Sequence, residues 1–153
     1  AMIAYYAGDV RRINHFLKVY GFAKAIGEME GLDESTQEII EIAALTHDIG
    51  IKNSEKKYNS SAGNYQQIEG PPEAKKLLAE LGIESGVIDR VCWLIAHHHT
   101  YTDIQGIDYQ ILVEADFLVN FYEDDMSIDS VHSAGGKMFK TLSGKAILNA
   151  IYS

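Results

Sequence analysis

The stretch from Ala43 to Lys52 constrains this chain most, because it ends an apolar helical pattern on two adjacent ionisable residues, His47 and Asp48. His47 lies seven residues after Ile40, so it continues the buried face of that helix. A carboxylate buried there without a partner carries a free-energy cost that a single domain cannot offset. The fold must therefore bring a metal ion or a network of ion pairs to this position.

Apolar residues recur at helical spacing through most of the chain. Helices are expected over about 9–30, 33–47, 71–81, 84–98, 108–123 and 137–151. This pattern predicts an all-α fold, a single-domain bundle of five to seven helices over residues 1–153. We expect a metal-site core at 9–123 and a C-terminal helical extension at 124–153. The polar residues 53–67 and the acidic residues 124–136 are typical of loops, the former of a lid over a binding site.

Composition narrows the function classes. The net charge of -9 argues against binding to a nucleic-acid duplex. No apolar run approaches membrane-spanning length and no leader precedes the first helix, so we expect a cytoplasmic protein without a membrane partner. Cys92 is the only cysteine, which excludes an internal disulfide and a thiolate metal cluster within one chain. The sequence is also compatible with a homodimer.

Three further sites carry polar residues on or beside apolar helix faces. His15 lies beside the stripe of the first helix, where a core histidine bonded to a carbonyl is an equal alternative. Asp116 faces inward within an apolar run, and for a lone buried Asp a cap or an Arg partner is the usual explanation. His97, His98 and His99 end the fourth helix and point in three directions, so at most two of them can face one site.

These alternatives weaken when the residues are combined. His15, His47, Asp48 and Asp116 fall on inward faces of three helices, and the sequence supplies too few buried cations to pair the carboxylates. Two imidazoles and two carboxylates suit a divalent transition metal (Mn, Fe, Co, Ni or Zn) or Mg, with coordination positions left for water. Such an open site is typical of catalytic rather than structural metals.

The order His15, His47-Asp48, Asp116 in a helical chain resembles the HD superfamily of metal-dependent phosphohydrolases, over about residues 9–122. Two-metal branches of that family carry a further His where this chain has Gln66 or Gln67, which leaves Glu69 as a substitute. Nucleotidase-like members often carry a Glu at the position of Ile51. Lys52 resembles, in type but not in register, a Lys of the cyclic-dinucleotide phosphodiesterases.

The resemblance implies hydrolysis of a small phosphate ester, nucleotide-like or other. Asp48 would ligate the metal and accept a proton from the attacking water, while Lys52 and His98 stabilise phosphate charge or protonate the leaving oxygen. If Lys52 does not stabilise the phosphate charge, Arg11 or Arg12 is the next candidate for that role. Candidates for a second metal or for phosphate binding are His97, His98, His99 and Glu69. The alternatives are an HD-type di-iron oxygenase, which needs six ligands, and a non-catalytic metal-stabilised binding module.

Overall fold

The computed structural model describes all 153 residues as helices and connecting segments, without a β-strand. The helices are α1 (Met2–Tyr5), α2 (Val10–Glu30), α3 (Glu34–Thr46), α4 (Ile51–Tyr58), α5 (Gly63–Glu80), α6 (Ser85–His97), α7 (Ile107–Glu123), α8 (Ile128–Met138) and α9 (Leu142–Ile151). The predicted all-α fold is confirmed. There are nine helices rather than five to seven, because α1, α4 and α8 lie outside the helices expected from periodicity.

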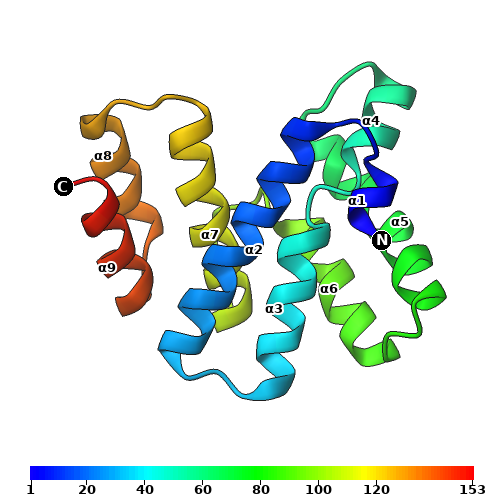
Figure 1. Cartoon of the computed structure of the whole chain (residues 1–153), viewed down its shortest axis with the longest axis horizontal. Coiled ribbons are helices and arrows are strands. Elements are labelled where there is room, and N and C mark those ends of the chain that lie inside the picture. The colour runs from blue at the N-terminus through cyan, green and yellow to red at the C-terminus, as the bar shows by residue number, and fades with distance from the viewer.

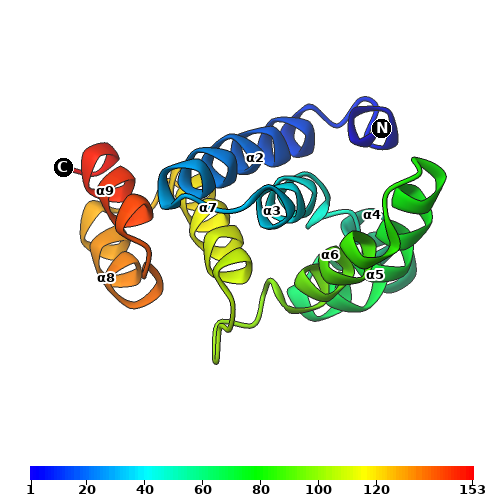
Figure 2. The ribbon, with the colours of Figure 1, turned by 90° about the horizontal axis from the view of Figure 1, so that it is seen from below.

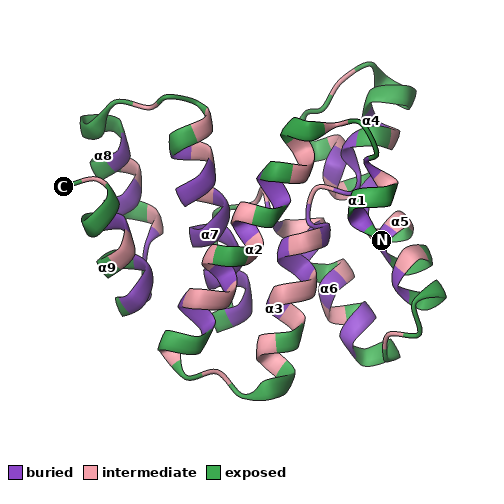
Figure 3. Cartoon of the chain, in the orientation of Figure 1, coloured by how far each residue is buried: buried purple, intermediate pink, exposed green.

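Four helices form the centre of the bundle. α3 packs between α2 and α6 and also contacts α7, while α2 lies along α7 (Figures 1 and 2). α5 packs along α6 at one end, and α8 and α9 pack on α7 at the other. The buried surfaces of these helices face one another (Figure 3), and burying each Leu, Ile or Val side chain contributes about 1.5–3 kcal/mol. None of the helices is both long and apolar enough to cross a membrane.

Local sequence sets the ends of α2 and α3. The Asp9 carboxylate accepts a hydrogen bond from the Arg12 backbone N–H at 3.1 Å, and Asp33 accepts one from Thr36 at 2.9 Å. Gly31 ends α2 with a φ of 72°, a left-handed conformation that glycine adopts without steric cost. The short connection between the two helices makes them antiparallel neighbours, so that His15 and His47 face the same interior.

The polar segment 53–67 is largely helical, so the prediction of a long loop there was wrong. α4 and α5 leave only residues 59–62 between them, and Pro71 and Pro72 lie inside α5 rather than at its start. Packing explains this departure from propensity: a Cβ atom on Gly50 would lie only 2.6 Å from the Gly70 backbone nitrogen. This close backbone contact, together with the packing of α5 on α6, outweighs the poor helix propensity of Gly and Pro.

The C-terminal residues also differ from expectation. The segment 124–136, predicted as a loop, contains most of α8, and the predicted helix 137–151 begins only at Leu142. Side-chain caps explain both starts, since Ser127 accepts from the Ser130 backbone N–H and Thr141 accepts from that of Gly144. The chain therefore makes a helical hairpin where one helix was expected.

Glu114, the second carboxylate in the apolar run of α7, holds this hairpin. Its Oε1 accepts hydrogen bonds from the backbone N–H groups of Lys140 at 2.6 Å and Thr141 at 2.9 Å, and from the Gln110 amide at 2.8 Å. The side chain is fully buried. Glu114 therefore has a structural role, because donors from the turn between α8 and α9 satisfy its buried carboxyl oxygen.

Candidate metal centre

The four side chains predicted as metal ligands converge in the interior. His15 comes from α2, His47 and Asp48 follow the end of α3, and Asp116 comes from the middle of α7. His15 Nε2 lies 3.3 Å from His47 Nε2, 3.2 Å from Asp116 Oδ1 and 3.4 Å from Asp48 Oδ2. His47 Nε2 lies 3.5 Å from Asp48 Oδ2 and 3.6 Å from Asp116 Oδ1.

These separations are those of donor atoms around a small cation. A tetrahedral ion with ligands at about 2.1 Å holds its donor atoms about 3.4 Å apart. The five distances between donor atoms, from 3.2 to 3.6 Å, surround that value. The residues present therefore fit a divalent ion, with His15, His47, Asp48 and Asp116 as the candidate ligands.

The histidines are oriented by their other ring nitrogens. His47 Nδ1 lies 2.8 Å from the Ala44 carbonyl oxygen, and His15 Nδ1 lies 2.9 Å from Glu123 Oε2. A carbonyl or a carboxylate oxygen can only accept, so each Nδ1 carries a proton, and whenever the ring is neutral its Nε2 presents a lone pair to the cluster. Metal-binding histidines are typically held in this way by a carbonyl or carboxylate, which fixes the tautomer and the ring orientation.

Two buried polar atoms at the cluster lack a hydrogen-bond partner, Asp116 Oδ1 and His98 Nε2. Asp116 Oδ1 lies 3.2 Å from His15 Nε2, and with its Nδ1 proton directed at Glu123, His15 can donate to Asp116 only when both ring nitrogens are protonated. Buried polar atoms nearly always have a hydrogen-bond partner in folded proteins. These two atoms have none, so they are available to bind an ion. The unpaired atoms are an independent sign that the donor set is incomplete without a cation.

The pKa values of the cluster are displaced toward its charged forms. Burial disfavours the charged His47 imidazolium, but the Asp48 and Asp116 carboxylates outweigh burial and raise the pKa of His47 to about 9. Burial likewise works to raise the pKa of Asp48, but the charge of His47 and the nearby His98 imidazole lower that pKa to about 2. Burial also works to raise the pKa of Asp116, but His15 and His47 hold that pKa far below its ordinary value. Without an ion, attraction between protonated imidazoles and ionised carboxylates therefore balances the charges of the cluster.

His98 and His99 form a second donor group on the other oxygen of Asp48. His98 Nε2 lies 3.5 Å from Asp48 Oδ1, and its Nδ1 lies 2.7 Å from the Ile95 carbonyl oxygen. His99 contributes a third ligand atom, all three lying within 4.8 Å of one another. The His99 Nε2 atom is also 3.0 Å from Gln66 Oε1, and burial lowers the pKa of His99 to about 4, so this ring is neutral near pH 7.

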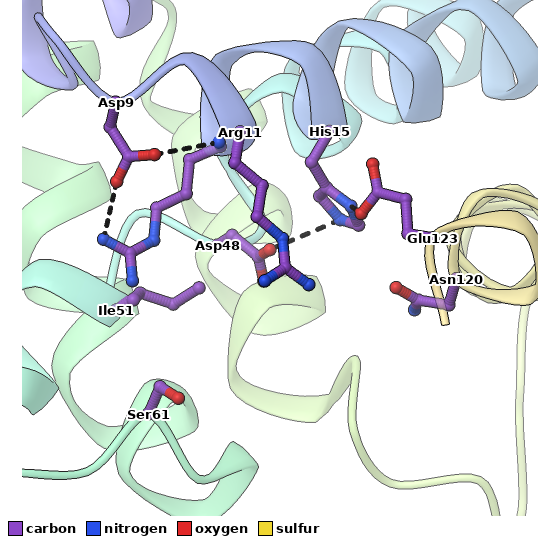
Figure 4. Close-up of a pocket in the computed structure, with 9 residues that line it drawn as sticks. Asp9, Arg11, His15, Asp48, Ile51, Ser61, Asn120 and Glu123 are labelled. Atoms are coloured by element: carbon purple, nitrogen blue, oxygen red, sulfur yellow. Dashed lines mark hydrogen bonds and ion pairs between the residues drawn. The ribbon is translucent and has the colours of Figure 1, made fainter. Parts of the chain in front are cut away.

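A pocket of about 280 Å3 opens beside the cluster (Figure 4). Nine residues line it, only one of them apolar: Asp9, Arg11, Arg12, His15, Asp48, Ile51, Ser61, Asn120 and Glu123. Asp48 keeps 18% of its side chain exposed, whereas His47 is fully buried. A polar ligand in this pocket therefore reaches the cluster through Asp48 and His15.

Three predicted site residues lie elsewhere. The Lys52 ammonium donates to the Tyr5 carbonyl oxygen at 3.1 Å and lies over the Tyr5 ring, so α1 draws it away from the pocket. Glu69 accepts from Lys57 at 2.7 Å and from the Tyr58 hydroxyl at 2.9 Å, away from the cluster. His97 stacks on Trp93, with Nδ1 2.7 Å from the carbonyl oxygen of that residue. Of the three consecutive histidines, His98 and His99 face the site.

Sequence reasoning missed Glu123. Its Oε2 orients His15, its Oε1 pairs with Lys18 at 2.7 Å, and its carboxylate lines the pocket. Burial works to raise the pKa of Glu123, but Lys18 and His15 lower it below its usual range. The spacing held a usable signal, because Glu123 follows Asp116 by seven residues, two turns along one face of α7.

Comparison with known proteins agrees with this geometry. The family model described as the HD domain matches residues 12–131. A crystal structure from an uncultured Thermotogales bacterium, described as a predicted HD superfamily hydrolase, is similar to the chain, with a TM-score of 0.69 and 20% sequence identity. The match covers 99% of this chain and 80% of that one, and at this identity it shows the fold alone. No curated protein matches the chain significantly.

Proposed function

This chain belongs to the HD-domain family, and from that premise we propose that it is a metal-dependent hydrolase of small phosphate esters. The observation that carries the proposal is the convergence of His15 and His47 Nε2 with Asp48 and Asp116 oxygens at the separations of metal ligands. His15, His47, Asp48 and Asp116 would hold a divalent ion, which would supply an acidified water and neutralise phosphoryl charge. The substrate class is a phosphomonoester or phosphodiester, nucleotide-like or other.

Asp48 is the residue best placed to handle the proton of the attacking water. The Asp48 side chain is more exposed than that of Asp116, the other site carboxylate, and it borders the pocket. As the water oxygen bonds to phosphorus and the ester P–O bond breaks, Asp48 accepts the water proton. With a pKa of about 2, the Asp48 carboxylate is a weak base. Its role is therefore to pass the proton on rather than to retain it.

His98 completes the relay to the leaving oxygen. Its Nε2 lies 3.5 Å from Asp48 Oδ1 and has no other partner, while Nδ1 stays tied to the Ile95 carbonyl. An imidazole held in this way takes a proton on Nε2 and gives it to a neighbouring oxygen without turning. We therefore assign His98 the protonation of the leaving alcohol, the role that Lys52, directed toward Tyr5, is not placed to fill.

The test is hydrolysis by protein first stripped of metal and then loaded with one ion at a time. Mn, Fe, Co, Ni, Zn and Mg are each added to wild type and to Asp48→Asn, and inorganic phosphate release is measured from a panel of nucleotides and sugar phosphates. Turnover that depends on metal and is lost in Asp48→Asn supports the proposal. Bound metal without turnover on any phosphate ester would instead support a metal-stabilised binding module.

A two-iron oxygenase is the second candidate, because His98 and His99 bring Asp48 two further imidazoles. With the quartet they give six donor residues, the number that this alternative requires. The His99 Nε2 is bonded to the Gln66 amide oxygen, which counts against its service as a ligand. Iron content near two per chain together with substrate-dependent oxygen uptake would favour this candidate over hydrolysis.

A further inference from the structure

Two adjacent arginines of α2 line the pocket, and only one of them has a partner within the protein. Arg12 Nη1 lies 2.8 Å from Asp9 Oδ2, its Nη2 lies 2.5 Å from Glu55 Oε1, and its guanidinium lies over the Tyr6 ring. Arg11 makes no ion pair and no side-chain hydrogen bond with any residue of the chain. Arg12 is therefore held by the protein itself, whereas Arg11 is free to bind a ligand.

Arg11 is positioned toward the cluster. It precedes His15 by four residues, so the two side chains emerge on the same face of α2 one turn apart. Figure 4 shows the guanidinium of Arg11 extending into the pocket that His15, Asp48 and Asn120 line. A molecule bound at the cluster through one oxygen therefore meets Arg11 with another part of its surface.

We propose that Arg11 binds the phosphate of the substrate in this pocket, a role that rests on the proposed hydrolysis of phosphate esters. A guanidinium offers five N–H donors in a planar fork that matches two phosphate oxygens at once. Arg11 is a substrate-binding residue, and it holds the phosphorus centre beside His15 and Asp48.

The charges around Arg11 favour an external anion over a partner from the protein. Asp9 is engaged by Arg12, and Glu123 is engaged by Lys18 and His15, so neither carboxylate is available to Arg11. Asn120 and Ser61 add uncharged polar groups to the same wall. Asp48, the third carboxylate of the pocket, faces His15, His47 and His98, so Arg11 is left as the unpaired cation that can attract a phosphate in a chain of net charge -9.

The experiment compares wild type, Arg11→Gln, Arg11→Lys and a charge control, Lys76→Gln, whose side chain is exposed on α5 and does not line the pocket. Inorganic phosphate is titrated into each protein with and without bound metal, and binding is followed by calorimetry. Metal content, melting temperature and the KM and kcat for a hydrolysed ester are measured on the same samples. The phosphate titration needs no turnover, so it tests Arg11 even if hydrolysis is not found.

We expect Arg11→Gln to weaken phosphate binding by roughly 10-fold to 100-fold, the loss typical of a charge-assisted hydrogen bond. KM should rise by a similar factor, with metal content and melting temperature unchanged, and Arg11→Lys should recover part of the loss. Lys76→Gln should match wild type. Phosphate binding that is absent from wild type, or equal in wild type and Arg11→Gln, overturns the inference. Turnover with an unaltered KM in Arg11→Gln would overturn it while leaving the hydrolase standing.

Discussion

Protein stripped of metal by a chelator is expected to lose stability as the pH rises from 6.5 to 9. The cause is His47, whose pKa the Asp48 and Asp116 carboxylates raise against burial from 6.5 to about 9. Because the folded pKa is the higher one, the stabilisation is fully present below pH 6.5 and is lost as the pH rises through 9. At about 1.4 kcal/mol for each pH unit of that interval, the free energy of unfolding falls by roughly 3 kcal/mol.

For a domain of this length the loss corresponds to a fall in melting temperature of roughly 6–12 °C. Metal-loaded protein should behave in the opposite way, because the ion displaces protons from the imidazoles and binds more tightly as the pH rises. The gap between loaded and chelated protein should therefore widen from pH 6.5 to pH 9. Differential scanning calorimetry at several pH values, with chelator and with a defined metal, measures both curves.

Two variants control this measurement. His47→Gln removes the titrating ring and should abolish most of the slope in chelated protein. His132→Gln should retain it, because His132 is exposed on α8, outside the cluster, with Nε2 2.8 Å from the Tyr152 carbonyl oxygen. Chelated wild type that melts at the same temperature at pH 6.5 and 9 would refute the coupling of His47 to the two carboxylates.

Three further outcomes are expected. His47→Ala should remove both bound metal, measured by elemental analysis, and metal-dependent turnover. Glu123→Gln should leave all four candidate ligands in place yet weaken metal binding by roughly 10-fold to 100-fold in a competition titration, because His15 loses its orienting carboxylate. Gly50→Ala should destabilise the fold by about 1–3 kcal/mol in chemical denaturation, since its Cβ would meet the α5 backbone at 2.6 Å.

The sequence alone located the cluster because helical periodicity reports which residues face inward. His47 and Asp116 continue apolar stripes and His15 lies beside one, and a buried imidazole or carboxylate needs a partner wherever the helices meet. Periodicity does not predict which helix faces pack against one another. The order of residues shared with the HD family supplied that step, and the assignment of ligand roles stays a prediction until metal is measured.

The errors fall where tertiary contacts override local preference. α5 contains Gly70, Pro71 and Pro72, and nothing local indicates that Gly50, twenty residues earlier, packs against that backbone. Lys52 is exposed and basic, as a phosphate-binding residue would be, but α1 supplies the Tyr5 carbonyl and ring that attract it. A helix of four residues is too short to show a periodic pattern.

Two parts of the chain that lie outside the expected helices, the end of α1 and the first half of α5, hold Asp48 in place. The hydroxyl of Tyr6, the residue that follows α1, donates to the Asp48 carbonyl oxygen at 2.8 Å, and the Gly50 backbone packs on α5 two residues further on. Asp48 lies in a turn, which would otherwise leave its side chain free to rotate, yet Oδ2 must face His15 and His47 while Oδ1 faces His98. A ligand that divides its two oxygens between two groups of imidazoles needs its backbone fixed from both sides. The proposed proton relay through Asp48 therefore depends on α1 and α5 as much as on the helices that carry the histidines.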